Sequence, residues 1–228
     1  MFFDPTYLIF VALPALVLSL AAQAFVNSAY SKWGKTRNSS GLTGVQVAER
    51  ILDRTNVRGV QLQGVPGRLT DHYDPEKNVV RLSEDIAATP SVAAMAVVAH
   101  ELGHAQQYQE RSALIGMRSF LIPAVRFSPQ IGVGMIFLGF LLRATGLIYL
   151  GILLFGVMVV FMILTLPVEF DASFRGLRLL REAGLMETQT DQEGASRVLT
   201  AAGLTYVAAA IGAILQLLYY LSLVNRRR

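Results

Sequence analysis

Four long apolar stretches with few charged residues divide the chain. The hydrocarbon core of a bilayer is about 30 Å thick and takes roughly 20 helical residues, and each stretch is close to that length. The stretches are Leu8–Val26, Phe120–Leu142, Leu147–Val168 and Leu204–Val224. They predict a mainly α-helical, multi-pass membrane protein with about four transmembrane helices.

Two of these stretches carry local irregularities. The residues AAQA at 21–24 resemble a signal-peptidase site, but the preceding MFFDPTY has no basic residue, so we expect an uncleaved anchor. The second stretch is interrupted near its start, where a charge and a proline are unfavourable inside a span. The interrupting residues are Arg126, Ser128, Pro129 and Gln130. This span therefore starts late, kinks or lies partly in the interface, and the sequence leaves all three open.

The segment between the first two stretches, residues 27–118, mixes polar and apolar positions and predicts a small domain that contains helices and strands. Residues 42–54 carry apolar side chains at near-helical spacing, which indicates an amphipathic helix. Residues 57–83 alternate apolar with polar positions, which indicates strands, and DPEKN at 74–78 is typical of the turn of a hairpin.

A buried helix is expected to follow the hairpin. Thr89 can act as its N-cap and Pro90 can take the first helical position, so that the helix begins at about Ser91. The run of alanines and valines after Ser91 indicates burial on most sides.

Composition supports a membrane protein. The chain is 53% hydrophobic and only 16% charged, with a mean hydropathy of +0.46. The net charge of +4 comes from basic residues scattered at the ends of the apolar stretches, without interleaved exposed aromatics, so we expect no nucleic-acid partner. Cysteine is absent, which excludes disulfides and thiolate metal sites.

The motif HELGH lies on the predicted buried helix and holds two of the three histidines of the chain. Residues four apart share one helix face, so His100 and His104 point toward a common spot, with Glu101 about 100° around the axis. Imidazoles are good Zn²⁺ ligands, and a neighbouring carboxylate can take a proton from the metal's water. The motif therefore predicts a zinc site with Glu101 as general base. Gly103, inside the motif, indicates the close approach of another backbone or of the metal site.

A catalytic zinc usually has three protein ligands, so a third ligand is needed. The candidates are His72 and the acidic pair Glu169 and Asp171. Two predicted spans separate His104 from Glu169, and an even number returns the chain to the same side of the membrane. Asp171 lies about 200° further around its helix than Glu169, so both cannot face the metal. These arguments favour Glu169, with His72 as the rival.

HELGH, two spans and then EFDAS from Glu169 resemble the YugP-like family of membrane zinc metallopeptidases. The resemblance covers almost the whole chain, including LTDHYDP, RLS and AAGLTYVAAA, and extends more distantly to HtpX-type and CAAX-processing membrane proteases. It implies an α+β zincin-like domain of the gluzincin type at the membrane surface. In the HtpX-type relatives a Glu at the position of Glu169 completes the zinc site, and an Asp supports it. Ser173 stands in the place of that Asp, and Asp171 is the alternative supporting residue.

The expected reaction is peptide-bond hydrolysis. Zn²⁺ held by His100, His104 and Glu169 lowers the pKa of its water toward about 7, and Glu101 takes the proton and later gives it to the leaving amine. His72 or Tyr73 could donate a hydrogen bond to the oxyanion. A sheet edge beside the motif helix can pair with an extended substrate. The edge strand is expected to contain Asn78, Val79, Val80 and Arg81.

These expectations define five consecutive parts. They are the first span at 1–28, the zincin-like domain at 29–118, a two-span hairpin at 119–168, surface helices with the third ligand at 169–203, and the last span with a basic tail at 204–228. The expected function is a membrane-embedded zinc endopeptidase acting on membrane-associated proteins or peptides. The alternative is a non-catalytic metal-binding scaffold or chaperone in the membrane.

Basic residues near span ends set the expected orientation. Those on the side of the site are Lys32, Lys35, Arg37, Arg118, Arg175, Arg178 and Arg181. The opposite side has Arg143 and the terminal Arg226–Arg228. The balance favours the cell membrane with the active site on the cytoplasmic side, and the C-terminal arginines are contrary evidence.

Overall fold

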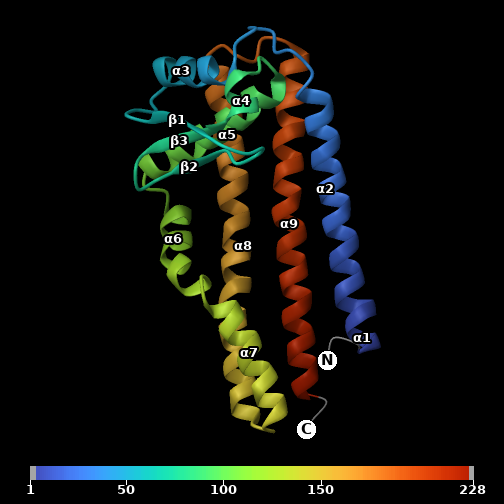
Figure 1. Cartoon of the computed structure of the whole chain (residues 1–228). Coiled ribbons are helices and arrows are strands. Elements are labelled where there is room, and N and C mark those ends of the chain that lie inside the picture. The colour runs from blue at the N-terminus through green and yellow to red at the C-terminus, as the bar shows by residue number, and fades with distance from the viewer. Residues whose placement is uncertain (1–3, 226–228) are drawn as a thin grey trace. The chain divides into compact units, whose positions relative to one another are not determined.

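The computed structural model describes residues 4–225, and it is mainly helical, at 74%. The helices are α1 (Pro5–Tyr7), the π-helical turn η1 (Leu8–Ala12), α2 (Leu13–Trp33), α3 (Gly44–Arg54), α4 (Glu84–Ala88), α5 (Val92–Gln109), α6 (Ala113–Val125), α7 (Ser128–Leu141), α8 (Thr145–Glu182) and α9 (Gln189–Asn225). The strands are β1 (Gln61–Val65), β2 (His72–Asp74) and β3 (Val79–Ser83) (Figure 1). The predicted mainly helical fold is confirmed, and the strands form a small mixed sheet.

The chain divides into two compact units. The first consists of residues up to Ala22 together with Gly116–Pro167 and the chain from Leu204 onward. The second consists of Gln23–Ile115 and Val168–Gly203, and therefore holds the sheet, α3, α4, α5 and the C-terminal part of α8. All residues of the motif HELGH lie in this second unit.

Three helical segments are long and apolar enough to cross a membrane within residues 4–225: Pro5–Trp33, Thr145–Glu182 and Gln189–Asn225. A fourth candidate arises only if α6 and α7 are counted as one span, because they are bent by 46° relative to each other. The bend falls at Arg126 and Phe127, directly before α7, which has Pro129 in its first turn. The predicted interruption coincides with this bend, and both its place relative to a membrane and the count of four spans stay predictions.

The sheet has the strand order β1-β3-β2, with β3 parallel to β1 and antiparallel to β2. The hairpin predicted at DPEKN joins β2 to β3 and is confirmed, and Figure 1 shows β3 between the other two strands.

The prediction that Asn78, Val79, Val80 and Arg81 form an edge strand is wrong, because both sides of β3 are paired. Val79, Val80 and Leu82 are buried. An almost continuous apolar strand is typical of a central position in a sheet, which explains the outcome.

Helix starts follow local capping rules. The predicted amphipathic helix is α3, where Thr43 and Gln46 form a capping box. The expected cap at Thr89 and Pro90 is wrong: Ser91 is the N-cap of α5, and its hydroxyl accepts a hydrogen bond from the backbone amide of Ala94. Thr89 instead ends the short helix α4, which the sequence pattern did not predict. The hydroxyl of an N-cap serine accepts a hydrogen bond from a backbone amide of the first turn that has no partner within the helix. A proline side chain has no acceptor and cannot do this.

The core of the second unit surrounds α5. Every residue from Val92 to Ala99 is at most 8% exposed. The predicted burial of the motif helix is therefore confirmed. A buried helix of this kind places its polar side chains in a defined environment, because each needs a partner.

Candidate metal centre

Two helices bring three ligand-type side chains together. The Nε2 atoms of His100 and His104, both on α5, lie 3.4 Å and 3.5 Å from Oε2 of Glu169 on α8. One ligand atom from each of the three lies within 4.8 Å of the others. Among residues 4–225 this is the single group of three or more His, Asp or Glu residues with such geometry. The expected proximity of Glu169 to the motif histidines is what the structure shows.

The close packing of α5 on α8 makes this gathering feasible. A Cβ added at Gly103 would lie 2.3 Å from the carbonyl oxygen of Ala172, and one added at Gly176 would lie 2.8 Å from that of Ala99. Two glycines thus face the opposite backbone at the crossing. The close approach that the sequence predicts at Gly103 is confirmed, and the partner is the backbone of α8.

Both histidines use their other ring nitrogen for a hydrogen bond. Nδ1 of His100 lies 3.2 Å from Oγ of Ser173, and Nδ1 of His104 lies 3.0 Å from Oε1 of Gln107. A ring that donates from Nδ1 keeps the Nε2 lone pair for a metal. The arrangement leaves both Nε2 atoms directed at the same place as the Glu169 carboxylate.

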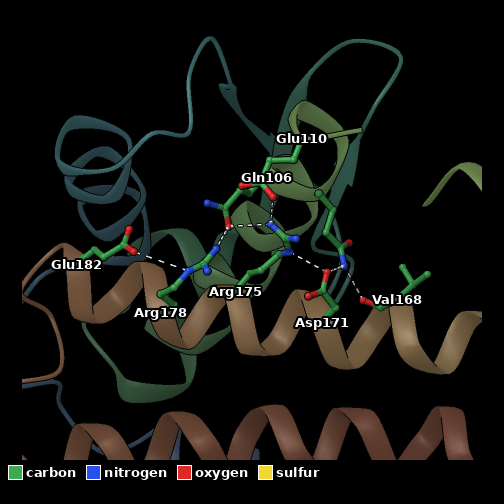
Figure 2. Close-up of polar contacts among 8 residues, drawn as sticks. Gln106, Glu110, Val168, Asp171, Arg175, Arg178 and Glu182 are labelled. Atoms are coloured by element: carbon green, nitrogen blue, oxygen red, sulfur yellow. Dashed lines mark hydrogen bonds and ion pairs between the residues drawn. The ribbon is translucent and has the colours of Figure 1, made fainter. Parts of the chain in front are cut away.

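Asp171 lies outside the group of ligand atoms and connects to it through Gln107. The amide nitrogen of Gln107 donates to Oδ2 of Asp171 at 2.7 Å, and Arg175 donates from Nε to the same oxygen at 2.7 Å. Figure 2 shows Asp171 and Arg175 side by side on α8, with Gln106 and Glu110 of α5 facing them. The angular argument that Asp171 and Glu169 cannot both face one metal is consistent with this placement.

Glu101 is buried at 8% exposure and is held by the sheet. Its Oε2 accepts a hydrogen bond from the backbone amide of Tyr73 on β2, at 2.9 Å. Strand β2 therefore contacts the motif helix through this hydrogen bond, and β3 also packs against that helix. The backbone of β2 positions the carboxylate that the sequence singles out as the base.

His72 and Tyr73 make contacts of their own. The ring of His72 is exposed, with Nδ1 2.8 Å from the carbonyl oxygen of Thr70 and Nε2 3.3 Å from the guanidinium of Arg81. The Tyr73 hydroxyl donates to Asn78 at 2.9 Å. Neither belongs to the group of ligand atoms. Their roles at an oxyanion stay predictions.

Charge and burial shift three pKa values near the site. Burial, together with Tyr108 and Asp74, raises the pKa of Tyr73 above its usual 10.0. The hydrogen bond from Arg81 lowers the pKa of Asp74 below 3.8. Burial lowers the pKa of His104, but the hydrogen bond to Glu169 and the charges of Glu101 and Glu169 outweigh burial, so it lies above 6.5. Because a metal ion binds only the neutral imidazole, a metal ion and a proton compete for His104.

The donor set fits Zn²⁺. Two imidazole nitrogens and one carboxylate oxygen are the ligand types of catalytic zinc sites, which leave a fourth position open. The residues that sequence reasoning missed are supporting ones. Gln107 follows His104 by three positions on a buried helix face, and this spacing could have indicated a contact.

The chain from residue 7 to residue 225 matches the family described as "Putative neutral zinc metallopeptidase". It is 42% identical over 212 residues to the "Putative membrane protease YugP" of Bacillus subtilis (strain 168), which covers 93% of this chain and 94% of that protein. No solved structure matches. The likeness of the sheet and α5 to a zincin domain therefore stays a prediction.

Proposed function

Because the chain belongs to this family of neutral zinc metallopeptidases, we propose that it is a membrane-embedded, zinc-dependent endopeptidase. The observation that carries the proposal is the set of three side chains, His100, His104 and Glu169, with Glu101 on the same helix as the histidines. A structural zinc site needs four protein ligands, whereas a catalytic one keeps a position for water or substrate.

Glu101 is the proposed general base. When bound, Zn²⁺ acts as a Lewis acid and lowers the pKa of a water molecule in the site. Glu101 accepts the proton of the attacking water and later returns it to the leaving amine. The amide of Tyr73 donates to Oε2 of Glu101, and we propose that Oε1 takes the proton. This hydrogen bond keeps the carboxylate in one orientation.

The proposed substrate is an extended segment of a membrane-associated protein or peptide. Strand β2 pairs only with β3 among the strands of the sheet, and its backbone contacts Glu101. An extended chain that adds to an open edge gains backbone hydrogen bonds, so β2 takes the place that the sequence assigned to β3. Helix α8 runs without a break from its apolar part to Glu169, which supports a site close to the bilayer.

The test compares Glu101→Gln with His100→Ala and His104→Ala. The wild-type protein is expected to bind one Zn²⁺ per chain, and either alanine variant is expected to lose it. Glu101→Gln is expected to keep zinc but to lose cleavage by about 100-fold or more, because the amide preserves shape and removes the proton acceptor. Zinc content and hydrolysis of membrane-associated peptides are measured on the same samples.

Full cleavage by Glu101→Gln would contradict the proposed mechanism. Stoichiometric zinc without any cleavage by the wild-type protein would instead support a non-catalytic scaffold or chaperone. The two readouts therefore separate metal binding from catalysis.

A further inference from the structure

Gln107 is unusual among the buried residues. It is 0% exposed, and among the largest fully buried side chains of the described residues it alone is polar. A buried amide needs partners for its oxygen and for both N–H groups. Gln107 has all three: Nδ1 of His104 for the oxygen, and the carbonyl oxygen of Val168 and Oδ2 of Asp171 for the nitrogen.

These partners determine which way the amide faces. The nitrogen lies 2.9 Å from the oxygen of Val168 and 2.7 Å from that of Asp171, and both of these atoms are acceptors. The reversed amide would place its oxygen against two other oxygens, which is unfavourable. Oε1 of Gln107 must therefore face His104, and it can only accept a hydrogen bond.

Asp171 is itself held in place. Its Oδ2 accepts a hydrogen bond from Nε of Arg175, and Nη1 of Arg175 donates to Oε2 of Glu110 at 2.5 Å (Figure 2). The chain of contacts thus begins at His104 on α5, crosses to Asp171 and Arg175 on α8, and returns to Glu110 on α5. Donors and acceptors alternate along it without a conflict.

We propose that Gln107 is a positioning residue that holds His104 in the form with a proton on Nδ1 and a free lone pair on Nε2, and that Asp171 and Arg175 keep Gln107 in this orientation. The inference rests on the zinc site of the proposed function, but not on peptide cleavage. Because Oε1 of Gln107 can only accept a hydrogen bond, Nδ1 of His104 must donate one. This leaves Nε2 of His104 as the metal-binding atom.

The test measures Zn²⁺ affinity of the full-length protein by competition with a chelator at constant pH. Gln107→Met keeps the volume and removes all three hydrogen bonds, and it is expected to weaken zinc binding by about 10 to 100-fold, as for loss of other groups that orient a ligand. Gln106→Met is the matched control. Gln106 is the neighbouring glutamine, and its side chain accepts hydrogen bonds from Arg175 and Arg178 rather than contacting His104, so its replacement is expected to leave the affinity within about twofold.

A double-mutant cycle tests the relay. Asp171 is about one-third exposed, and Asp171→Ala is expected to fold and to weaken zinc binding several-fold in the wild-type background. In the Gln107→Met background the same change is expected to have no further effect, because Asp171 acts only through Gln107. A purely structural role of Asp171 would give the same loss in both backgrounds.

A rescue pair tests the acceptor. Gln107→Glu combined with Asp171→Asn restores an acceptor for His104, and the new amide at position 171 donates to the new carboxylate at position 107. The contact with the carbonyl oxygen of Val168 becomes unfavourable, so the rescue is expected to be partial. This pair is expected to bind zinc about tenfold more tightly than Gln107→Met. Thermal unfolding in chelator identifies variants that do not fold, and if Gln107→Met is one of them, Asp171→Ala and the rescue pair are compared with the wild-type protein.

Zinc affinity within about twofold of wild type in Gln107→Met, or in Asp171→Ala where Gln107→Met does not fold, would overturn the proposal. Equal losses of zinc affinity in Gln107→Met and Gln106→Met would also overturn the proposal. The proposed peptidase function fails on a different result, namely cleavage by Glu101→Gln.

Discussion

The two imidazoles of the metal centre are supported in different ways, although they lie four residues apart on one helix. His104 faces a fully buried amide that is anchored by a charged pair. His100 faces the single hydroxyl of Ser173. The Ser173 hydroxyl can rotate and can both donate and accept, whereas the Gln107 amide oxygen only accepts, so His100 is expected to be the less strongly supported ligand.

Replacement of Ser173 tests this difference. Ser173→Ala removes the acceptor at Nδ1 of His100 and is expected to weaken zinc binding by up to about tenfold, which is less than for Gln107→Met. Zinc affinity is measured by chelator competition. Thr165→Ala is the matched control, because the Thr165 hydroxyl of the same helix donates to the backbone oxygen of Phe161. Unchanged zinc affinity in Ser173→Ala would show that this hydrogen bond has no role in holding the metal.

At the scale of elements, the site depends on how closely α5 and α8 approach. Gly103 and Gly176 both face the backbone of the opposite helix, at a place where no Cβ fits. His100 and His104 flank Gly103 on α5, and Glu169 and Ser173 lie one to two turns before Gly176 on α8. A change in the separation of these helices would therefore move Glu169 relative to both histidines.

Gly103→Ala is expected to separate the helices. Alanine raises helix propensity by about 1 kcal/mol, but the clash with Ala172 involves backbone that cannot rotate away, and such overpacking costs about 1–3 kcal/mol. We expect weaker zinc binding, together with a lower or unchanged unfolding temperature. Gly116→Ala is the control, because a Cβ there would meet nothing within 4 Å. Wild-type zinc affinity in Gly103→Ala would argue against the crossing as the determinant of the site.

At the scale of the whole molecule, two segments far apart in the sequence meet in the second unit. The backbone amide of Ser39 donates to Oδ1 of Asp191, at 3.1 Å. Residues 40 and 190 therefore lie on the same side of any membrane that the chain spans. The basic residues near these segments favour the cytoplasmic side for the site.

Cysteine labelling tests this topology without background, because the chain has no cysteine. Ser40→Cys and Thr190→Cys are expected to react with a membrane-impermeant reagent from one side, and Ala144→Cys from the other. In intact cells the first two are expected to be protected if the site is cytoplasmic. Labelling of positions 40 and 190 from opposite sides would exclude the proposed arrangement of spans.

The sequence by itself determined the features that depend on local chemistry. Apolar length marked the candidate spans, the turn residues at 74–78 marked the hairpin, and the spacing of His100, Glu101 and His104 marked the motif helix. Counting the predicted spans placed Glu169 on the same side as the histidines, and its role as a ligand is still a prediction. These signals are readable because each lies within a few residues or follows from the thickness of a bilayer.

Only the tertiary structure decided which segments lie next to each other. It placed β1 against β3 and thereby made β3 central, and it set β2 against Glu101. It also brought Gln107 to Asp171 and Ser173 to His100, over 64 and 73 positions of sequence. Such contacts depend on the packing of whole elements, where small residues such as Gly103 and Gly176 let backbones meet. The pattern of apolar and polar residues within one segment does not specify which other segment will pack against its exposed edge or face.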